Sequence, residues 1–194
     1  MKDRFHPHDI MVASGDVVNL ETISEKDIDL ADILFSITAQ PRFAGHLPVS
    51  YTVGQHTLAM YVAGAAMGEH TGVLRTLLMH DMHEYLTGDI PSPVKRLLGP
   101  EIGELEDRID TAIFQHFRHL PTPAEVGRCK HYDDLMWQAE LHVLRNVKWD
   151  RLRDDMYLVL CATVRKISTF DTPKVQRALL ASLEHEFSKQ EVMQ

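Results

Sequence analysis

Long apolar runs, paired cysteines and an excess of basic residues are all missing from this sequence of 194 residues. No stretch approaches the ~20 consecutive apolar residues that span a bilayer, so we expect no membrane anchor. The two cysteines, Cys129 and Cys161, belong to no CxxC motif and are expected to be reduced core residues. The first residues, MKDRFHPHDIMVASGD, lack the apolar region of a secretory signal, which favours a cytoplasmic location.

The shortage of positive charge limits the kinds of partner. A formal net charge of −8 argues against binding a nucleic-acid polymer, because such binding needs a basic face that releases counterions from phosphates. One phosphate group needs only local basic residues, and Arg42, Lys95 and Arg96 lie near the residues considered below. With 44% hydrophobic and 25% charged residues, the composition is typical of a globular protein with a full core.

Amphipathic helical patterns separated by short breaks dominate the chain, with no alternating strand pattern and no internal repeat. They predict an all-α fold in a single domain over residues 1–194, with a core over about 24–167 and a C-terminal helix over 172–189. One helix is expected between a capping-box-like start at Ser24 and Asp27 and an end near Gln40. Further helices are expected over about 53–67, 73–86, 102–113, 129–144 and 154–167.

Glycine and proline mark the boundaries of several expected helices. The helix over 73–86 should end at Gly88, because glycine readily adopts the left-handed conformation of a helix cap. The next segment, DIPSPVK (89–95), contains two prolines and is expected not to be regular helix. The last helix should begin with Thr172 as its cap and Pro173 in the first helical position.

The sequence contains twelve histidines, and one of them, His80, is followed directly by an aspartate, Asp81. Asp81 falls on the apolar stripe of its expected helix, seven residues after Leu74 and four before Tyr85. A carboxylate on a buried stripe needs a cation, strong donors or a metal ion, and the adjacent imidazole favours the metal. On the doublet alone, however, an ordinary packed or exposed histidine is the commoner interpretation.

Other residues could complete a metal site around the doublet. His56 lies on the preceding expected helix, and Asp133 or Asp134 lies on a later one. Two imidazoles and two carboxylates form a mixed nitrogen and oxygen set that suits zinc, manganese, iron, cobalt or nickel. Glu84 shares the helix face of the doublet, where a carboxylate could direct a water molecule. The helix break that follows brings Asp89 and Lys95 back toward the same end.

Three segments, YTVGQH, LLMHDMHEYLTGDIPSPVKRLL and YDDLMWQAE, resemble the H…HD…D pattern of HD-domain metal-dependent phosphohydrolases. The resemblance covers about residues 29–140 and lies with the branch of bacterial 5'-deoxynucleotidases and phage deoxynucleotide phosphohydrolases. The upstream segment PRFAGH resembles the Arg-aromatic element of this branch, and ASGDVVNL with RFAGHLPVSYTVGQH is most similar to its phage members. The resemblance implies a compact, all-helical HD-domain bundle that forms a homo-oligomer, in the host cytoplasm if the protein is phage-encoded.

The resemblance also implies a role for each matching residue. The metal ligands would be His56, His80, Asp81 and Asp133, with Asp134 as the alternative to Asp133. Glu84 would act on the attacking water, Asp89 on substrate or leaving group, and Arg42 and Lys95 would bind phosphate. Three further assignments stay open between a substrate contact and a packing, supporting or exposed role: Phe43 near the nucleoside, His83 as a phosphate ligand or acid, and His46.

The expected activity is metal-dependent hydrolysis of a deoxynucleotide at its 5' phosphoester. The first hypothesis is a dNTP triphosphohydrolase, with dATP as a candidate substrate, that releases deoxynucleoside and triphosphate. Arg96, which follows Lys95, favours this longer phosphate chain. The alternatives are a 5'-deoxynucleotidase acting on dNMPs and a nucleotide-binding HD domain without turnover. The expected cofactor is zinc, cobalt or manganese, with a second divalent ion such as magnesium on the phosphates.

Overall fold

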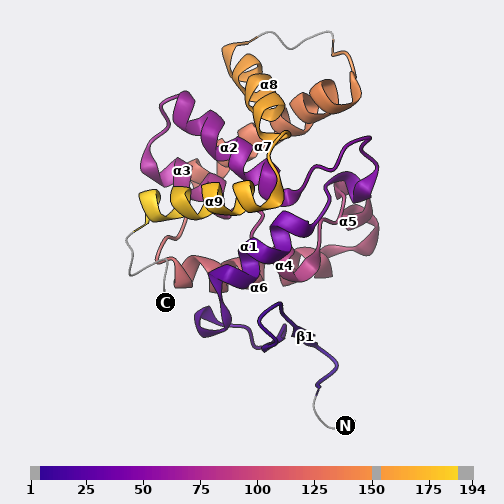
Figure 1. Ribbon diagram of the computed structural model, residues 1–194. Coiled ribbons are helices and arrows are strands. Elements are labelled where there is room, and N and C mark those ends of the chain that lie inside the picture. The colour runs from indigo at the N-terminus through magenta and orange to yellow at the C-terminus, as the bar shows by residue number, and fades with distance from the viewer. Residues whose placement is uncertain (1–4, 150–153, 188–194) are drawn as a thin grey trace.

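The computed structural model describes residues 5–149 and 154–187, and most of its regular structure is helical (Figure 1). The exception is a short antiparallel hairpin of β1 (Asp9–Met11) and β2 (Val17–Asn19). Its first and last residues pair, with Asp9 opposite Asn19. The expected all-α class is confirmed, although the sequence pattern did not reveal this hairpin.

The helices follow one another along the chain with short connections. No helix within the described residues is long and apolar enough to cross a membrane. In chain order they are the 3-10 turn η1 (Glu25–Asp27), α1 (Leu30–Ala39), the 3-10 turn η2 (Phe43–Gly45), α2 (Val53–Ala66), α3 (Thr71–Met79), α4 (Glu84–Thr87), α5 (Ser92–Leu98), α6 (Pro100–His116), α7 (Pro123–Arg145), α8 (Asp155–Ile167) and α9 (Thr172–Glu186).

Helix α2 lies at the centre of the bundle and packs against α1, α3, α7, α8 and α9. All its residues from Val53 to Met60 are buried, and each large apolar side chain in this run contributes roughly 1.5–3 kcal/mol by leaving water. The Thr52 hydroxyl and the Gln55 side chain form a capping box that fixes the start of the helix. Gly54 permits the close approach of α1, since a Cβ there would lie 2.6 Å from Cγ2 of Thr38. His56 is therefore held in the fully buried part of the central helix.

The single helix expected over 73–86 is instead broken at the His80-Asp81 doublet. Helix α3 ends at Met79, and α4 begins at Glu84. Between them the backbone bonds tighten to a three-residue spacing, from Met82 N–H to Met79 O and from Glu84 N–H to Asp81 O. Buried residues continue through the break, so the apolar stripe could not reveal the change in backbone geometry.

The segment DIPSPVK was expected to be non-helical, and this prediction was wrong for its second half. Helix α5 begins at Ser92, with Pro91 as its cap and Pro93 in its first turn. Proline is tolerated there because amides of the first turn have no acceptor within the helix. Gly88 does follow α4 as its cap with a positive φ of 76°, but its ψ of 162° differs from the left-handed helical cap that was expected. Lys95 is consequently presented by a helix rather than by a loop.

Two expected helix caps were also misplaced. The capping box of Ser24 and Asp27 is present, but it begins only η1, and the Asp29 carboxylate caps α1. Asp171, not Thr172, caps α9 by accepting from the backbone N–H of Lys174, while Pro173 lies in the first turn. Aspartate and threonine are both good caps, so adjacent candidates cannot be separated by residue type. Helix α9 ends at Glu186, and residues 188–189 of the expected helix lie outside the described residues.

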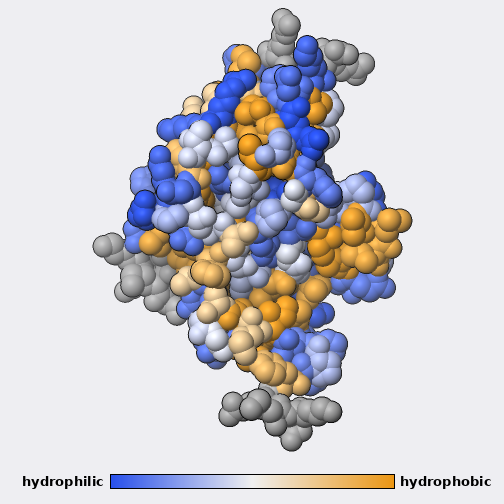
Figure 2. All heavy atoms as spheres, turned by 45° about the vertical axis from the view of Figure 1, so that its right-hand side comes forward, coloured by the Kyte–Doolittle hydropathy of each residue, from blue (hydrophilic) through white to orange (hydrophobic). Residues whose placement is uncertain are grey.

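The surface carries apolar side chains in several separate patches on the face shown in Figure 2. Helix α5 contributes exposed apolar residues, Val94, Leu97 and Leu98, of which Leu97 is 89% exposed. The same helix turns Lys95 and Arg96 toward a pocket. Helix α5 is therefore divided between an apolar face open to solvent and a basic face that serves the site.

Candidate functional site

The four residues expected to bind a metal come together from two helices, α2 and α7, and from the turn after α3. Nε2 of His56 in α2 lies 3.1 Å from Nε2 of His80 and 3.4 Å from Oδ2 of Asp81. The same His56 nitrogen lies 3.4 Å from Oδ1 of Asp133 in α7, and His80 Nε2 lies 3.1 Å from Asp81 Oδ2. We call these four residues the HD donor set.

The outer nitrogens of the two imidazoles explain why their inner nitrogens face one another. His80 Nδ1 lies 2.9 Å from the Leu77 carbonyl oxygen, and His56 Nδ1 lies 2.7 Å from Oε1 of Glu140. Both partners are acceptors, so each Nδ1 carries the proton and each Nε2 turns a lone pair toward the other. Two lone pairs 3.1 Å apart repel one another unless a cation lies between them. This position fits either a proton or a metal ion.

The donor separations match those around a bound transition metal. A tetrahedral ion with bonds of about 2.0–2.2 Å holds its donor atoms about 3.3–3.6 Å apart, and octahedral edges are shorter. The three separations among His56, His80 and Asp81, and the one between His56 and Asp133, are 3.1–3.4 Å. Asp133 is half-buried and turned into the set, whereas Asp134 is exposed. The geometry thus brings Asp133, and not its neighbour, to His56.

Glu140 joins the HD donor set to Arg42. Its side chain is fully buried, with Oε1 at His56 Nδ1 and Oε2 3.3 Å from Nε of Arg42. Arg42 also lies 3.4 Å from Asp81 Oδ2. Burial and Arg42 lower the pKa of His56, but Glu140 and Asp133 outweigh them and raise it to about 9. One carboxylate therefore orients a candidate ligand and a candidate phosphate-binding residue together.

Acidic side chains beside the donor set have pKa values shifted in opposite directions. Burial alone would raise the pKa of Asp81, but His80, His56 and Arg42 hold it well below its ordinary value. Burial raises the pKa of Glu84 to about 9, with Asp81 adding to the increase. Glu84 is 4% exposed, and its Oε2 has no hydrogen-bond partner among the described residues. A buried carboxyl group with an unpaired oxygen at a pocket wall is typical of a proton-transfer residue.

Asp89 lines the same pocket, and burial raises its pKa above the ordinary value. Lys95 also lines the pocket, but its Nζ lies 2.7 Å from Oε1 of Glu106 on α6. His83, which was considered as a substrate contact, is buried and does not line the pocket; its Nδ1 lies 3.0 Å from Oδ1 of Asp110. Through this contact, Asp110 attaches helix α6 to the turn that contains the His80-Asp81 doublet.

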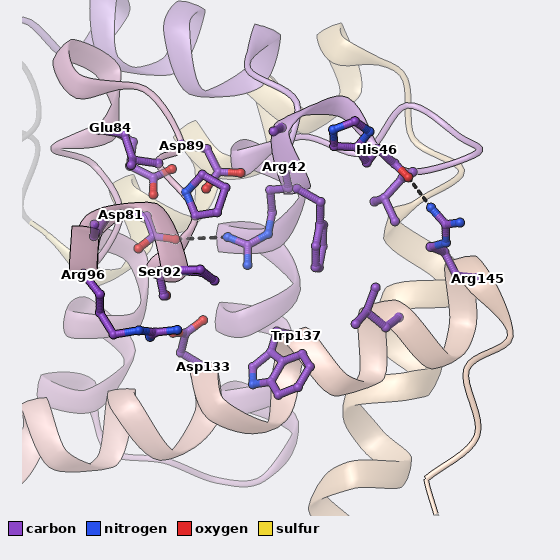
Figure 3. Close-up of a pocket in the computed structure, with 18 of the residues that line it drawn as sticks. Arg42, His46, Asp81, Glu84, Asp89, Ser92, Arg96, Asp133, Trp137 and Arg145 are labelled. Carbon is purple, nitrogen blue, oxygen red and sulfur yellow. Dashed lines mark hydrogen bonds and ion pairs between the residues drawn. The ribbon is translucent and has the colours of Figure 1, made fainter. Parts of the chain in front are cut away.

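The pocket beside the donor set has a volume of about 900 Å³ and opens between α5, α7 and the loop after α1 (Figure 3). Its wall combines acidic, basic and apolar side chains, which is the mixture that a nucleotide would require. In the loop, Phe43 and Ala44 both adopt positive φ, of 57° and 49°. Such a conformation is uncommon outside glycine and often marks functional loops. The lining residues include Arg42, Phe43, His46, Leu47, Asp81, Glu84, Asp89, Lys95, Arg96, Asp133, Trp137, Leu141 and Arg145.

Comparison with known proteins places this arrangement in a family. A family model described as HD domain matches residues 50–136. Uncharacterized protein YfdR of Escherichia coli (strain K12) is 34% identical over 131 residues, which are 68% of this chain and 69% of that protein. An uncharacterized protein of Rhodobacter capsulatus is 31% identical over 121 residues, which are 59% of this chain and 61% of that protein. This chain belongs to the HD-domain family.

HD domains are typically metal-dependent hydrolases, and three residues of the HD donor set, His56, His80 and Asp81, offer donor atoms within 4.8 Å of one another that could hold a divalent ion. The matched region of this HD domain contains all four residues of the set together with Glu84 and Lys95. Arg42 and Glu140 lie outside the matched region, at either end, and the fold brings them to the same site.

Several residues of the site were not selected from the sequence. Glu140 lies on the buried face of α7, one helical turn after Met136 and two turns after Asp133. An acidic residue on a buried stripe was therefore the signal that could have identified it. Trp137 and Arg145 reach the pocket from the same helix (Figure 3). Glu106 and Asp110 had no such signal, since they lie on the less buried part of α6 and their partners are distant in sequence.

Proposed function

We propose that this HD domain is a metal-dependent phosphohydrolase that acts on deoxynucleotides, with dNTP triphosphohydrolase activity as the first candidate. The observation that carries the proposal is the continuity of the pocket. One cavity of about 900 Å³ touches Asp81 and Asp133 of the donor set, the basic residues Arg42, Lys95 and Arg96, and the aromatic residues Phe43 and Trp137. If the phosphate chain binds next to the donor set, the nucleoside can pack against the apolar part of the pocket wall.

The HD donor set would hold the ion through two imidazoles and two carboxylates. A bound divalent ion would supply Lewis acidity for the attacking water, and its positive charge would offset Asp81 and so favour the ionised form of Glu84. Glu84 then accepts the proton that the water loses as its oxygen bonds to phosphorus. The unpartnered Oε2 of Glu84 supports this role, because the buried oxygen lacks a hydrogen-bond donor in the described part of the protein.

Arg42 would stabilise the phosphoryl oxygens of the reacting phosphate, and Asp89 would protonate its leaving group. Arg42 is held by Asp81 and Glu140, so its guanidinium is already oriented when the phosphoryl oxygens gain charge. Asp89 has a raised pKa and lines the pocket, which suits a carboxylic acid that protonates the departing 5' oxygen. The bond between phosphorus and the 5' oxygen breaks, and the deoxynucleoside leaves with the proton from Asp89.

A 5'-deoxynucleotidase acting on dNMPs is the second candidate, and the pairing of the basic residues favours it. Lys95 is already paired with Glu106, and an Arg145 guanidinium nitrogen donates to the His46 carbonyl oxygen. Less positive charge then remains for the phosphates beyond the first. Arg96 favours the triphosphate instead, because it lines the pocket next to Lys95.

The test is to incubate the metal-loaded protein with a panel of dNTPs, dNMPs and NTPs and to separate the products by chromatography. Triphosphate with deoxynucleoside supports the first candidate, and phosphate released from dNMPs alone supports the second. No turnover with zinc, cobalt or manganese would contradict both. A Lys95→Ala variant should lose more activity on dNTPs than on dNMPs if Lys95 binds the longer chain, and the exposed Lys130→Ala serves as its control.

A further inference from the structure

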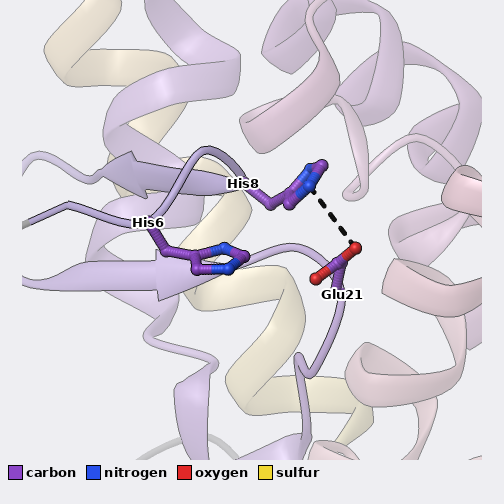
Figure 4. A group of neighbouring side chains, drawn as sticks. All are labelled: His6, His8 and Glu21. Atoms are coloured by element: carbon purple, nitrogen blue, oxygen red, sulfur yellow. Dashed lines mark ion pairs between the residues drawn. The ribbon is translucent and has the colours of Figure 1, made fainter.

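A second group of potential metal ligands lies outside the HD pocket, at the open end of the β1–β2 hairpin. His6 and His8 precede β1, and Glu21 follows β2 (Figure 4). Each offers one donor atom, and these atoms all lie within 4.8 Å of one another. The rings of His6 and His8 have centroids 5.3 Å apart, and Nε2 of His8 lies 3.4 Å from Oε1 of Glu21. We call these three residues the hairpin donor set.

The backbone of the hairpin holds these residues in place, and Nδ2 of Asn19 lies 3.4 Å from Nδ1 of His6, which leaves Nε2 of that ring as its candidate donor atom. Beyond the paired strands, the N–H of Leu20 donates to the carbonyl oxygen of His8 at 2.9 Å, which extends the ladder toward Glu21. The backbone N–H of His6 donates to Oδ2 of Asp9, while Oδ1 of Asp9 accepts from the Asn19 side chain. Asp9 is therefore occupied as a structural tie, and its contacts bring the two ends of the hairpin together.

The side-chain geometry fits a metal ion better than a direct ion pair. A charged N–H···O hydrogen bond is usually about 2.7–2.9 Å long. The 3.4 Å between His8 and Glu21 is longer, and it equals the donor separation around a tetrahedral ion with bonds of about 2.0–2.2 Å. All three side chains are exposed, so hydrated ions can reach them and water can fill the remaining positions.

We propose that His6, His8 and Glu21 form a second divalent transition-metal site, which links the two ends of the hairpin. Two imidazoles and one carboxylate suit zinc, nickel or copper, and the site would bind magnesium poorly. No residue is shared with the HD donor set. The hairpin donor set does not line the pocket that contains Glu84 and Arg42, so we assign it binding rather than hydrolysis.

Zinc binding to the full chain tests this site, by equilibrium dialysis followed by metal analysis. With three to four protein ligands per site, wild type should bind about two zinc ions per chain, and His8→Ala and Asp81→Ala should each bind about one. The double variant should bind almost none. The exposed His131→Ala, which lies on α7, should match wild type. His8→Ala keeps the backbone bond to Leu20, so loss of zinc would not reflect loss of the hairpin.

This experiment tests the hairpin site and the HD site independently of one another. If His8→Ala binds as much zinc as wild type, the hairpin site does not exist, whatever Asp81→Ala does. If Asp81→Ala keeps the wild-type zinc content while His8→Ala loses one equivalent, the HD site is wrong and the hairpin site stands. Copper adds a spectroscopic check, because nitrogen hyperfine splitting from two imidazoles should be reduced in both His6→Ala and His8→Ala.

Discussion

The HD donor set and the hairpin donor set use the same kinds of residue in opposite surroundings. In the HD set, His56 is fully buried, and each imidazole is oriented by an acceptor at its outer nitrogen. In the hairpin set, His8 and Glu21 are each more than half exposed, and the backbone ladder does the positioning. The comparison indicates that a close group of donor atoms is enough to bind a metal, whereas hydrolysis also requires a pocket, a buried acid and a basic group beside the ion.

The largest expected effect separates hydrolysis from metal binding within the HD site. Glu84→Gln removes the proton acceptor but none of the four donors, so kcat should fall by about 10²- to 10⁴-fold with unchanged metal content. Steady-state kinetics and metal analysis of the same preparation would measure both. The control is Glu101→Gln, an exposed acid on α6 that should leave both quantities unchanged. A Glu84→Gln protein that hydrolyses as fast as wild type would remove Glu84 from the mechanism.

The next prediction uses two adjacent aspartates as a matched pair. Asp133→Ala should lower zinc affinity by about 10- to 100-fold or more, because Oδ1 of Asp133 lies 3.4 Å from His56 Nε2. Asp134→Ala should bind zinc as wild type does, since this side chain is exposed. Isothermal titration calorimetry can measure both variants. The reverse pattern would show that Asp134, the alternative left open by the sequence, is the ligand.

Glu140→Gln tests whether the buried acceptor distinguishes the HD set from the hairpin set. This change keeps the shape of the side chain but weakens its contacts with His56 and Arg42. Zinc affinity of the HD site should fall by about 10- to 100-fold, as is usual when the partner of a metal-bound histidine is lost. The zinc bound by the hairpin set should stay the same in that titration. Equal weakening of both sites would indicate a general loss of structure.

A smaller effect concerns the pH dependence of zinc binding at the HD set. Because the pKa of His56 is raised to about 9, the imidazole holds a proton at neutral pH that a metal ion must displace. Zinc affinity should therefore rise with pH up to about 9, by about tenfold per unit where one proton is released. Titrations at several pH values in the His8→Ala background would isolate the HD set. An affinity that is constant between pH 7 and 9 would contradict the bound proton.

Much of the fold followed from local pattern, and the errors have a common cause. The apolar stripes predicted α1, α6 and α9 because the buried residues of each follow the helical periodicity. The break at His80 was missed because the burial of Met82 and Tyr85 continues the stripe. The start of α5 was missed because proline reads as a helix breaker except in the first turn. The apolar periodicity of the sequence therefore predicted which segments are helical better than it predicted where each helix begins and ends.

The candidate site was less accessible to sequence reasoning. The HD doublet, His56 and Glu84 stood out through residue type and spacing, and the resemblance to a family supplied the remaining roles. Glu140 was missed because its partner His56 lies 84 residues away, and no local rule connects two positions at that distance. The pairing of Lys95 with Glu106 has the same origin. These contacts arise only when α7 and α6 pack beside the doublet.

The most direct test of the central account is hydrolysis of dATP in ¹⁸O-labelled water by the zinc- or cobalt-loaded protein. Attack on phosphorus with Glu84 as base predicts that the label enters the released triphosphate and that the deoxyadenosine carries none. The metal-free protein and Asp81→Ala should release neither product. Label in the nucleoside, or equal turnover by Asp81→Ala, would contradict phosphoryl hydrolysis at the HD donor set.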